Sequence, residues 1–117
     1  MQNSEREKLV SSMRCVVELL VDKKYDELER MTGGRRLSSV ELRQAVIDYG
    51  RTLTIPPERV WDRLDVIEVK DRDQPTYSVR FDLWANGTQS DLSIEVTIIQ
   101  VSPSGEFKTE VDDLHVL

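Results

Sequence analysis

The sequence is poor in the residues that build the commonest chemical sites. Its 117 residues include one cysteine, Cys15, and one histidine, His115. A single cysteine excludes an internal disulfide framework and thiolate metal sites. A single histidine excludes zinc sites built mainly from imidazole and thiolate ligands, which leaves carboxylates as the groups able to hold a hard cation.

Long apolar segments are also missing. No run approaches the roughly 18 apolar residues of a membrane span. The longest, near Val16 and Val21, is interrupted by Glu18 and ends at Asp22. The first residues, Met1 to Lys8, are polar and mixed in charge, unlike a secretory signal. We therefore expect a cytoplasmic protein that makes no membrane contact.

Charge is distributed unevenly along the chain. Residues 1–63 carry 12 Lys/Arg and 11 Asp/Glu, whereas residues 64–117 carry 4 and 11, so the net charge of −6 belongs to the second half. The first half has the period of helices and the second the period of strands. An acidic sheet repels nucleic acid and anionic membranes and attracts basic partners. The sequence thus favours a basic protein partner.

The helical half contains three predicted helices. A capping box of Ser4 and Glu7 begins the first, and a second box of Ser38 and Glu41 begins the third. Glycines at 33–34 and at 50 end the second and third helices. The apolar faces are Leu9, Met13, Val16, Val17, Leu20 and Val21 in the first helix, with Cys15 buried beside them; Tyr25, Leu28 and Met31 in the second; and Leu42, Ala45, Val46 and Tyr49 in the third.

The second half reads as an antiparallel meander with strands at 64–69, 77–85, 92–101 and 107–117. Asn86-Gly87 is typical of a type I′ hairpin turn, because both residues accept positive φ. Pairing residue 85 with residue 88 sets the register. That register places Tyr77 opposite Val96, Val79 opposite Ile94 and Phe81 opposite Leu92.

These patterns predict one domain over residues 1–117, with a helical half at about 1–63 and a strand half at about 64–117. The expected fold class is α+β: three N-terminal helices packed on one face of a curved four-stranded antiparallel meander. The long strands suggest a sheet that curls around the first helix.

The order of elements, together with the closing segment Val111-Asp112-Asp113-Leu114-His115-Val116-Leu117, resembles small bacterial proteins of the nuclear-transport-factor-2-like group. The resemblance implies a cystatin-like roll around an N-terminal helix. Several such stand-alone domains are similar to immunity proteins that neutralise toxins of competing bacteria, so the resemblance also implies a toxin inhibitor. Enzymes of the group place Asp, His or Tyr inside the cone. Here the corresponding face carries Val79, Phe81, Leu92, Ile94 and Val96, which argues against catalysis.

A candidate partner-binding surface lies on the strand face that points away from the core. Alternation places Trp84 on that face, where Ile99 and Val101 also lie. An exposed aromatic ringed by carboxylates is typical of a protein-binding hot spot. The candidate contact residues are Trp84, Asp82, Arg80, Glu110, Asp112 and Asp113. Two alternatives remain: a loop or the segment around Trp61 covers this face, or Trp84 and Ile99 form a dimer contact.

Other functions have weaker support. Asp113 and His115 lie two apart on a strand, so a carboxylate could orient an imidazole for base catalysis, but no nucleophile accompanies them. The acidic residues lack EF-hand spacing. We expect no catalytic residue, metal or cofactor. The alternative functions are a ligand binder or enzyme that uses the cone interior, with Tyr77, Tyr49, His115 and Asp113 as its polar groups, and a structural domain that dimerises through its sheet. The sequence leaves monomer and homodimer open.

Overall fold

The computed structural model describes residues 3–117 and confirms the α+β class. The helices come first: α1 (Asn3–Val21), α2 (Tyr25–Thr32) and α3 (Ser39–Tyr49). They are followed by β1 (Leu53–Thr54), the 3-10 helix η1 (Glu58–Arg63), β2 (Asp65–Val69), β3 (Thr76–Ala85), β4 (Thr88–Gln100) and β5 (Phe107–Val116). The strands form one open antiparallel sheet in which β1 and β2 both pair with β3, and the order continues to β4 and β5. The predicted meander corresponds to β2–β5, and the two-residue strand β1 is an addition that the sequence did not reveal.

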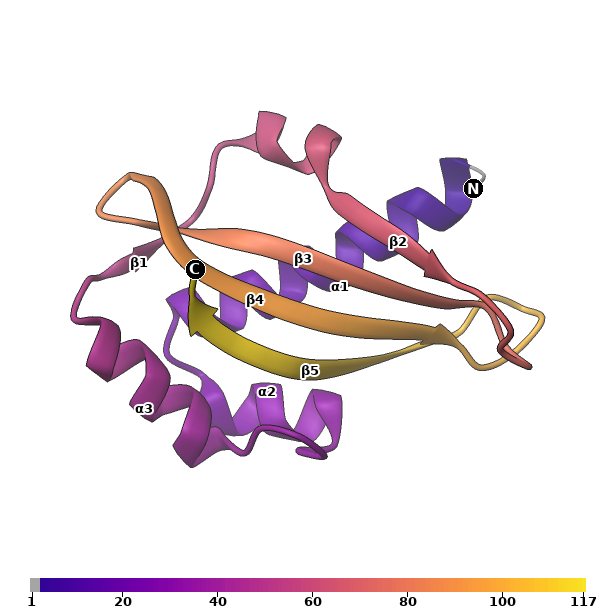
Figure 1. Ribbon diagram of the computed structural model, residues 1–117, viewed down its shortest axis with the longest axis horizontal. Helices are drawn as coiled ribbons and strands as arrows, with labels where there is room; N and C mark the ends of the chain where they lie inside the picture. The colour runs from indigo at the N-terminus through magenta and orange to yellow at the C-terminus, as the bar shows by residue number, and fades with distance from the viewer. Residues whose placement is uncertain (1–2) are drawn as a thin grey trace.

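The helices leave one face of the sheet open. Figure 1 shows α1 running behind the curved sheet, with α2 and α3 beside the β5 edge and η1 beyond the opposite edge. In the described part of the chain, no helix crosses the front of the sheet. We call the face toward α1 the inner face and the opposite one the outer face. None of the helices in residues 3–117 has the length and apolar character needed to cross a bilayer.

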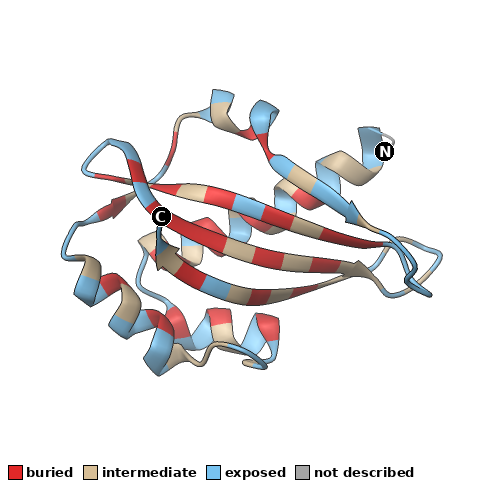
Figure 2. Ribbon diagram, in the orientation of Figure 1, coloured by how far each residue is buried: buried red, intermediate tan, exposed pale blue. Residues whose placement is uncertain are grey.

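The core lies between α1 and the inner face. Burial alternates along β3, as the coloured bands in Figure 2 show, and the buried row consists of Tyr77, Val79, Phe81, Leu83 and Ala85. The helix contributes Leu9, Met13, Val16, Val17 and Leu20, of which none is more than 1 % exposed. The expected burial of Cys15 is wrong, because Cys15 is exposed and its Sγ lies 3.6 Å from Met31 Sδ, which is itself exposed. Cys15 sits just outside the angular limits of the apolar stripe.

The capping residues and glycines in the sequence predicted the helix ends correctly, except at the start of α1. The capping box of Ser38 and Glu41 is present at the start of α3, and Gly33 and Gly50 end α2 and α3 at a φ of 77°. The first capping box is misplaced, because α1 already includes Asn3 and Ser4 therefore lies inside the helix.

The β3–β4 hairpin follows the predicted turn but not the whole predicted register. Asn86 and Gly87 have φ values of 52° and 79°, and Ala85 pairs with Thr88 as expected. Beyond a bulge between Trp84 and Asp82 the partners differ: Tyr77 lies opposite Ile98, Val79 opposite Val96 and Phe81 opposite Ile94. The shift equals two residues, so every side chain keeps its predicted face.

Ser90 supplies the hydrogen bonds that the bulge removes from the ladder. It is buried, and its hydroxyl donates to the carbonyl of Leu83 at 2.6 Å and accepts from the amide of Leu92 at 3.2 Å. Two buried backbone groups are thereby satisfied where the strands lose their regular pairing.

We expect Ser90→Ala to lower the free energy of unfolding by about 1–3 kcal/mol, because it leaves both buried backbone groups without their hydrogen-bond partner. Ser93→Ala is the matched control: Ser93 is also buried, but its hydroxyl has no hydrogen-bond partner within residues 3–117. The control should change stability by no more than about 0.5 kcal/mol, or increase it. Urea denaturation of both variants tests this, and equal losses would contradict the role of Ser90.

Tyr77 joins the sheet to the start of α1. It is 2 % exposed, and its hydroxyl donates to Glu5 Oε2 at 3.1 Å. Burial, and then the hydrogen bond and charge of Glu5, raise the pKa of Tyr77 to about 12. In the unfolded chain a tyrosine ionises near pH 10.

The raised pKa makes stability fall at alkaline pH. Below about pH 10 the phenol is protonated in both states and its contribution is complete; between about pH 10 and 12 the unfolded chain loses the proton first, and at most about 2–3 kcal/mol is lost. Tyr77→Phe should therefore flatten the decline in unfolding free energy over this range relative to the unsubstituted chain. Urea denaturation on either side of pH 10 measures the difference, and an unchanged slope in the variant would refute it.

Candidate functional site

The outer face of the sheet is acidic. Within residues 3–117, strand register places five carboxylates on it, and a sixth joins them by accepting a hydrogen bond from Thr97, which belongs to the same face. The strands place two cationic side chains there. The carboxylates are Asp65, Asp82, Glu95, Glu110, Asp112 and Asp113, and the cations are Arg80 and Lys108. The predicted site residues all belong to this face, but the structure divides them into three groups.

The first group surrounds Trp84. A hollow of about 560 Å³ lies between η1 and the outer face, and Arg80, Asp82 and Trp84 contribute to its walls. Trp84 is half-buried and packs against the edge of the core. Asp82 accepts a hydrogen bond from Gln89 Nε2 at 3.2 Å, and Arg80 pairs with Asp65 at 3.8 Å. The remaining wall consists of Arg59, Val60, Asp62, Arg63, Asp65, Phe81 and Gln89. The hollow is thus lined by three arginines and three aspartates, so its positive and negative charges balance.

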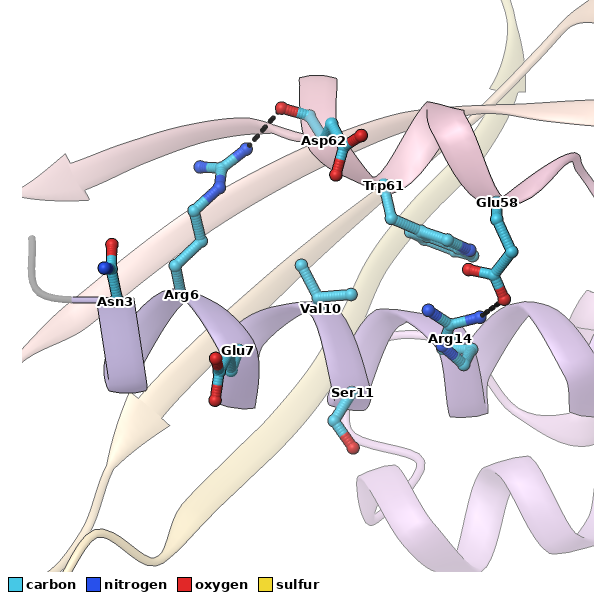
Figure 3. Close-up of a pocket in the computed structure, with 9 residues that line it drawn as sticks. All are labelled: Asn3, Arg6, Glu7, Val10, Ser11, Arg14, Glu58, Trp61 and Asp62. Carbon is cyan, nitrogen blue, oxygen red and sulfur yellow. Dashed lines mark hydrogen bonds and ion pairs between the residues drawn. The ribbon is translucent and has the colours of Figure 1, made fainter.

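The segment around Trp61 forms one wall of this hollow, and α1 holds it in place. Trp61 itself is 5 % exposed and stacks on Phe81, with ring centroids 4.9 Å apart, while the guanidinium of Arg14 lies 5.2 Å from the indole centre. Figure 3 shows two further links: Arg6 donates to the carbonyl of Asp62 at 3.2 Å, and Arg14 pairs with Glu58 at 2.5 Å. This ion pair raises the pKa of Arg14 and lowers that of Glu58.

These links span a second hollow of about 570 Å³ between α1 and η1 (Figure 3). Both of its arginines are already engaged with η1. We therefore assign this hollow a structural role, in which α1 fixes the 3-10 helix that walls the Trp84 hollow.

The second group lies at the β5 edge, where the connection between α2 and α3 approaches the strand. Arg35 lies 3.7 Å from Glu110, and Arg36 lies 3.4 Å from Asp112. Asp112 also accepts a hydrogen bond from Thr97 Oγ1. The side chains of Glu110 and Asp112 are only 14 % and 20 % exposed, so these two carboxylates are largely occupied within the chain.

The third group is Asp113 with His115, which share the outer face as predicted, and Glu95 joins them from β4. His115 Nδ1 lies 3.0 Å from Asp113 Oδ2 and 3.8 Å from Glu95 Oε2. Asp113 and Glu95 are 53 % and 43 % exposed, so they are more open to a partner than Glu110 and Asp112.

A bulge in β5 creates this third group. Val111 pairs with Val96 and Asp113 with Glu95, so Asp112 is an extra residue between them. The insertion allows Val111 and Leu114, three positions apart, both to point inward, and it turns Asp113 and His115 outward. The spacing of those two apolar residues was the sequence signal for the bulge. Glu95 was not among the predicted site residues, because its pairing with Asp113 depends on this bulge.

The polar residues suggested for a cone interior do not converge. Tyr49 donates to Asp91 at 2.6 Å on the surface, Tyr77 contacts Glu5 on α1, and Asp113 and His115 lie on the outer face. The inner face is instead packed with apolar side chains, including Val79, Ile94 and Val96 at 0 % exposure.

Comparison with known proteins identifies the family but no activity. A family model described as "Domain of unknown function (DUF7668)" matches residues 17–117, and the chain belongs to this family. No curated protein and no solved structure matches the chain. The family's boundaries include the whole sheet and both groups of outer-face residues on β4 and β5.

The two tryptophans allow the accessibility of the Trp84 hollow to be measured. Trp61→Phe leaves Trp84 as the only indole, and Trp84→Phe leaves the buried Trp61. We expect acrylamide to quench the fluorescence of Trp84 more strongly, because Trp84 is half-buried in an open hollow while Trp61 is 5 % exposed. Quenching of Trp84 as weak as that of Trp61 would mean that η1 covers the hollow.

Proposed function

We propose that this chain is an acidic protein-binding domain that engages a basic partner through the outer face of its sheet. The observation that carries the proposal is the group of six carboxylates on a face that no helix of the described structure crosses, although η1 walls one end of it. Opposite potentials steer two proteins together and can raise association rates well above those of neutral surfaces.

The Trp84 hollow gives this surface an anchor point. Hot spots combine a large aromatic side chain with a pocket that excludes water, and tryptophan is among the residues most enriched in them. Trp84 lies in a charge-balanced hollow at one end of the outer face, and the exposed acids Glu95 and Asp113 lie beyond it. A partner with one inserted side chain and a basic rim would fit both features.

Within this class, we favour an immunity protein that neutralises a cognate bacterial toxin in the cytoplasm. The support is the resemblance of the chain to small bacterial immunity domains, together with its acidic face. A basic nuclease toxin is a suitable partner, because an inhibitor that mimics the charge of nucleic acid can occupy its substrate-binding surface.

The test begins with capture of a partner from lysate of the source cells at low salt, in EDTA, followed by purification of that partner and binding kinetics. Trp84→Ala should weaken the affinity roughly 30-fold or more, the equivalent of about 2 kcal/mol. Asp113→Lys should slow association by roughly tenfold at low salt, with little effect at high salt.

Glu27→Lys is the matched control, because it makes the same charge change at an exposed position of α2. The control should alter association much less than Asp113→Lys. Equal effects of the two reversals, with normal binding by Trp84→Ala, would refute the outer-face site. Co-expression with the captured protein then tests immunity: growth should be restored by the parent chain and not by Trp84→Ala.

A further inference from the structure

A cluster on the outer face of β4 and β5 combines the ligand types of a transition-metal site. Glu95, Asp113 and His115 each offer one ligand atom, and these atoms lie within 4.8 Å of one another. Two ligands held tetrahedrally at about 2.1 Å from an ion are separated by about 3.4 Å. The observed separations from His115 Nδ1, 3.0 Å and 3.8 Å, lie on either side of that value. Both carboxylates therefore lie at about the distance from His115 Nδ1 that ligands of one ion would have.

The contacts within this cluster leave two like charges facing each other and one ring nitrogen without a hydrogen bond in the described structure. Glu95 and Asp113 lie directly opposite each other in the ladder. Like charges in that position destabilise an antiparallel pair. His115 Nδ1 is shielded from solvent and has no hydrogen-bond partner among residues 3–117, because its close contact with Asp113 lacks hydrogen-bond geometry. A bound cation would relieve the repulsion and give this nitrogen a partner.

A second, independent feature lies beside the cluster. Ser93 is opposite His115 in the ladder, is 0 % exposed, and has a hydroxyl without a hydrogen-bond partner in the described chain. Asp82 lies opposite Ser93 on the other side, and its Oδ1 is also shielded and has no hydrogen-bond partner among the described residues. One cross-strand row therefore contains three shielded polar atoms that residues 3–117 leave unsatisfied, which is unusual for buried polar groups in native proteins.

The arginines that lie beside these strands pair with other carboxylates. Arg80 lies opposite Glu95, but its ion pair is with Asp65. Arg36 faces Asp112 at the β5 edge. The negative charge of Glu95 and Asp113 is thus free to attract a cation from solution.

We propose that Glu95, Asp113 and His115 form a binding site for a divalent transition-metal ion of the zinc class. One imidazole nitrogen and two carboxylate oxygens suit Zn²⁺, whereas Ca²⁺ requires six to eight oxygen ligands. Three protein ligands leave a coordination position for water. The site goes beyond the proposed partner-binding function and does not depend on it.

Calorimetric titration with ZnCl₂ tests the site on tag-free protein in a Cys15→Ser background, because a tag or the exposed thiol would also bind zinc. We expect saturable binding of one ion per chain. His115→Gln, Glu95→Gln and Asp113→Asn should each weaken it by at least about tenfold, since even outer-shell partners contribute that much. Imidazole nitrogen NMR should show the Nδ1 resonance of His115 shifting with zinc.

Glu110→Gln is the matched control, because it removes the same charge from the neighbouring part of β5. It should leave zinc affinity within about threefold, the scatter expected of a general field effect at a surface. Circular dichroism without metal checks that each variant folds. The proposal is overturned if zinc does not saturate a single site, if Glu110→Gln weakens binding as much as Glu95→Gln, or if CaCl₂ binds as tightly as ZnCl₂.

Discussion

The burial of one row of β4 determines the chemistry of the opposite face. Ile94, Val96 and Ile98 are 0 % exposed against the inner core. Each such side chain stabilises the fold by about 1.5–3 kcal/mol. Because successive side chains of a strand point to opposite faces, Glu95, between Ile94 and Val96, must lie on the outer face. Like-charged cross-strand pairs cost only about 0.2–1 kcal/mol each. The free energy gained by burying the apolar row therefore exceeds the cost of charge repulsion, and the fold retains an acidic outer face.

Two irregularities in the ladders refine this arrangement in different ways. The β3–β4 bulge shifts the pairing by two residues, so it changes neighbours but leaves the faces intact. The β5 bulge inserts the single residue Asp112. A shift by one residue reverses the faces to which the following side chains point. It is this second bulge that keeps Leu114 in the core while His115 faces outward. The outer-face cluster with Glu95 is a consequence of core packing at the C-terminal strand.

The sequence was most informative where a structure depends on neighbouring residues, although the equally local capping box at Ser4 was misplaced. The Ser38 capping box, the Gly50 helix end and the Asn86-Gly87 turn involve only contacts within a few positions, and all three were predicted correctly. The fold class followed from the change of hydrophobic period. The register beyond Leu83 was wrong because it depends on Ser90 satisfying a bulge, which is a contact between strands. The pairing of Arg35 and Arg36 with β5 was invisible for the same reason.

A basic partner and a divalent cation would both bind to carboxylates of the outer face. A basic partner gains from every free carboxylate there, while a divalent cation held by Glu95 and Asp113 would neutralise two of the most exposed ones. Binding at two sites that share charges is thermodynamically reciprocal, so a metal ion that weakens partner binding must itself be bound more weakly in the complex. Trp84 lies in a hollow whose own charges balance, and Glu110 and Asp112 are held by arginines. Competition between metal and partner would therefore be confined to the β4–β5 part of the surface and would leave the aromatic anchor unaffected.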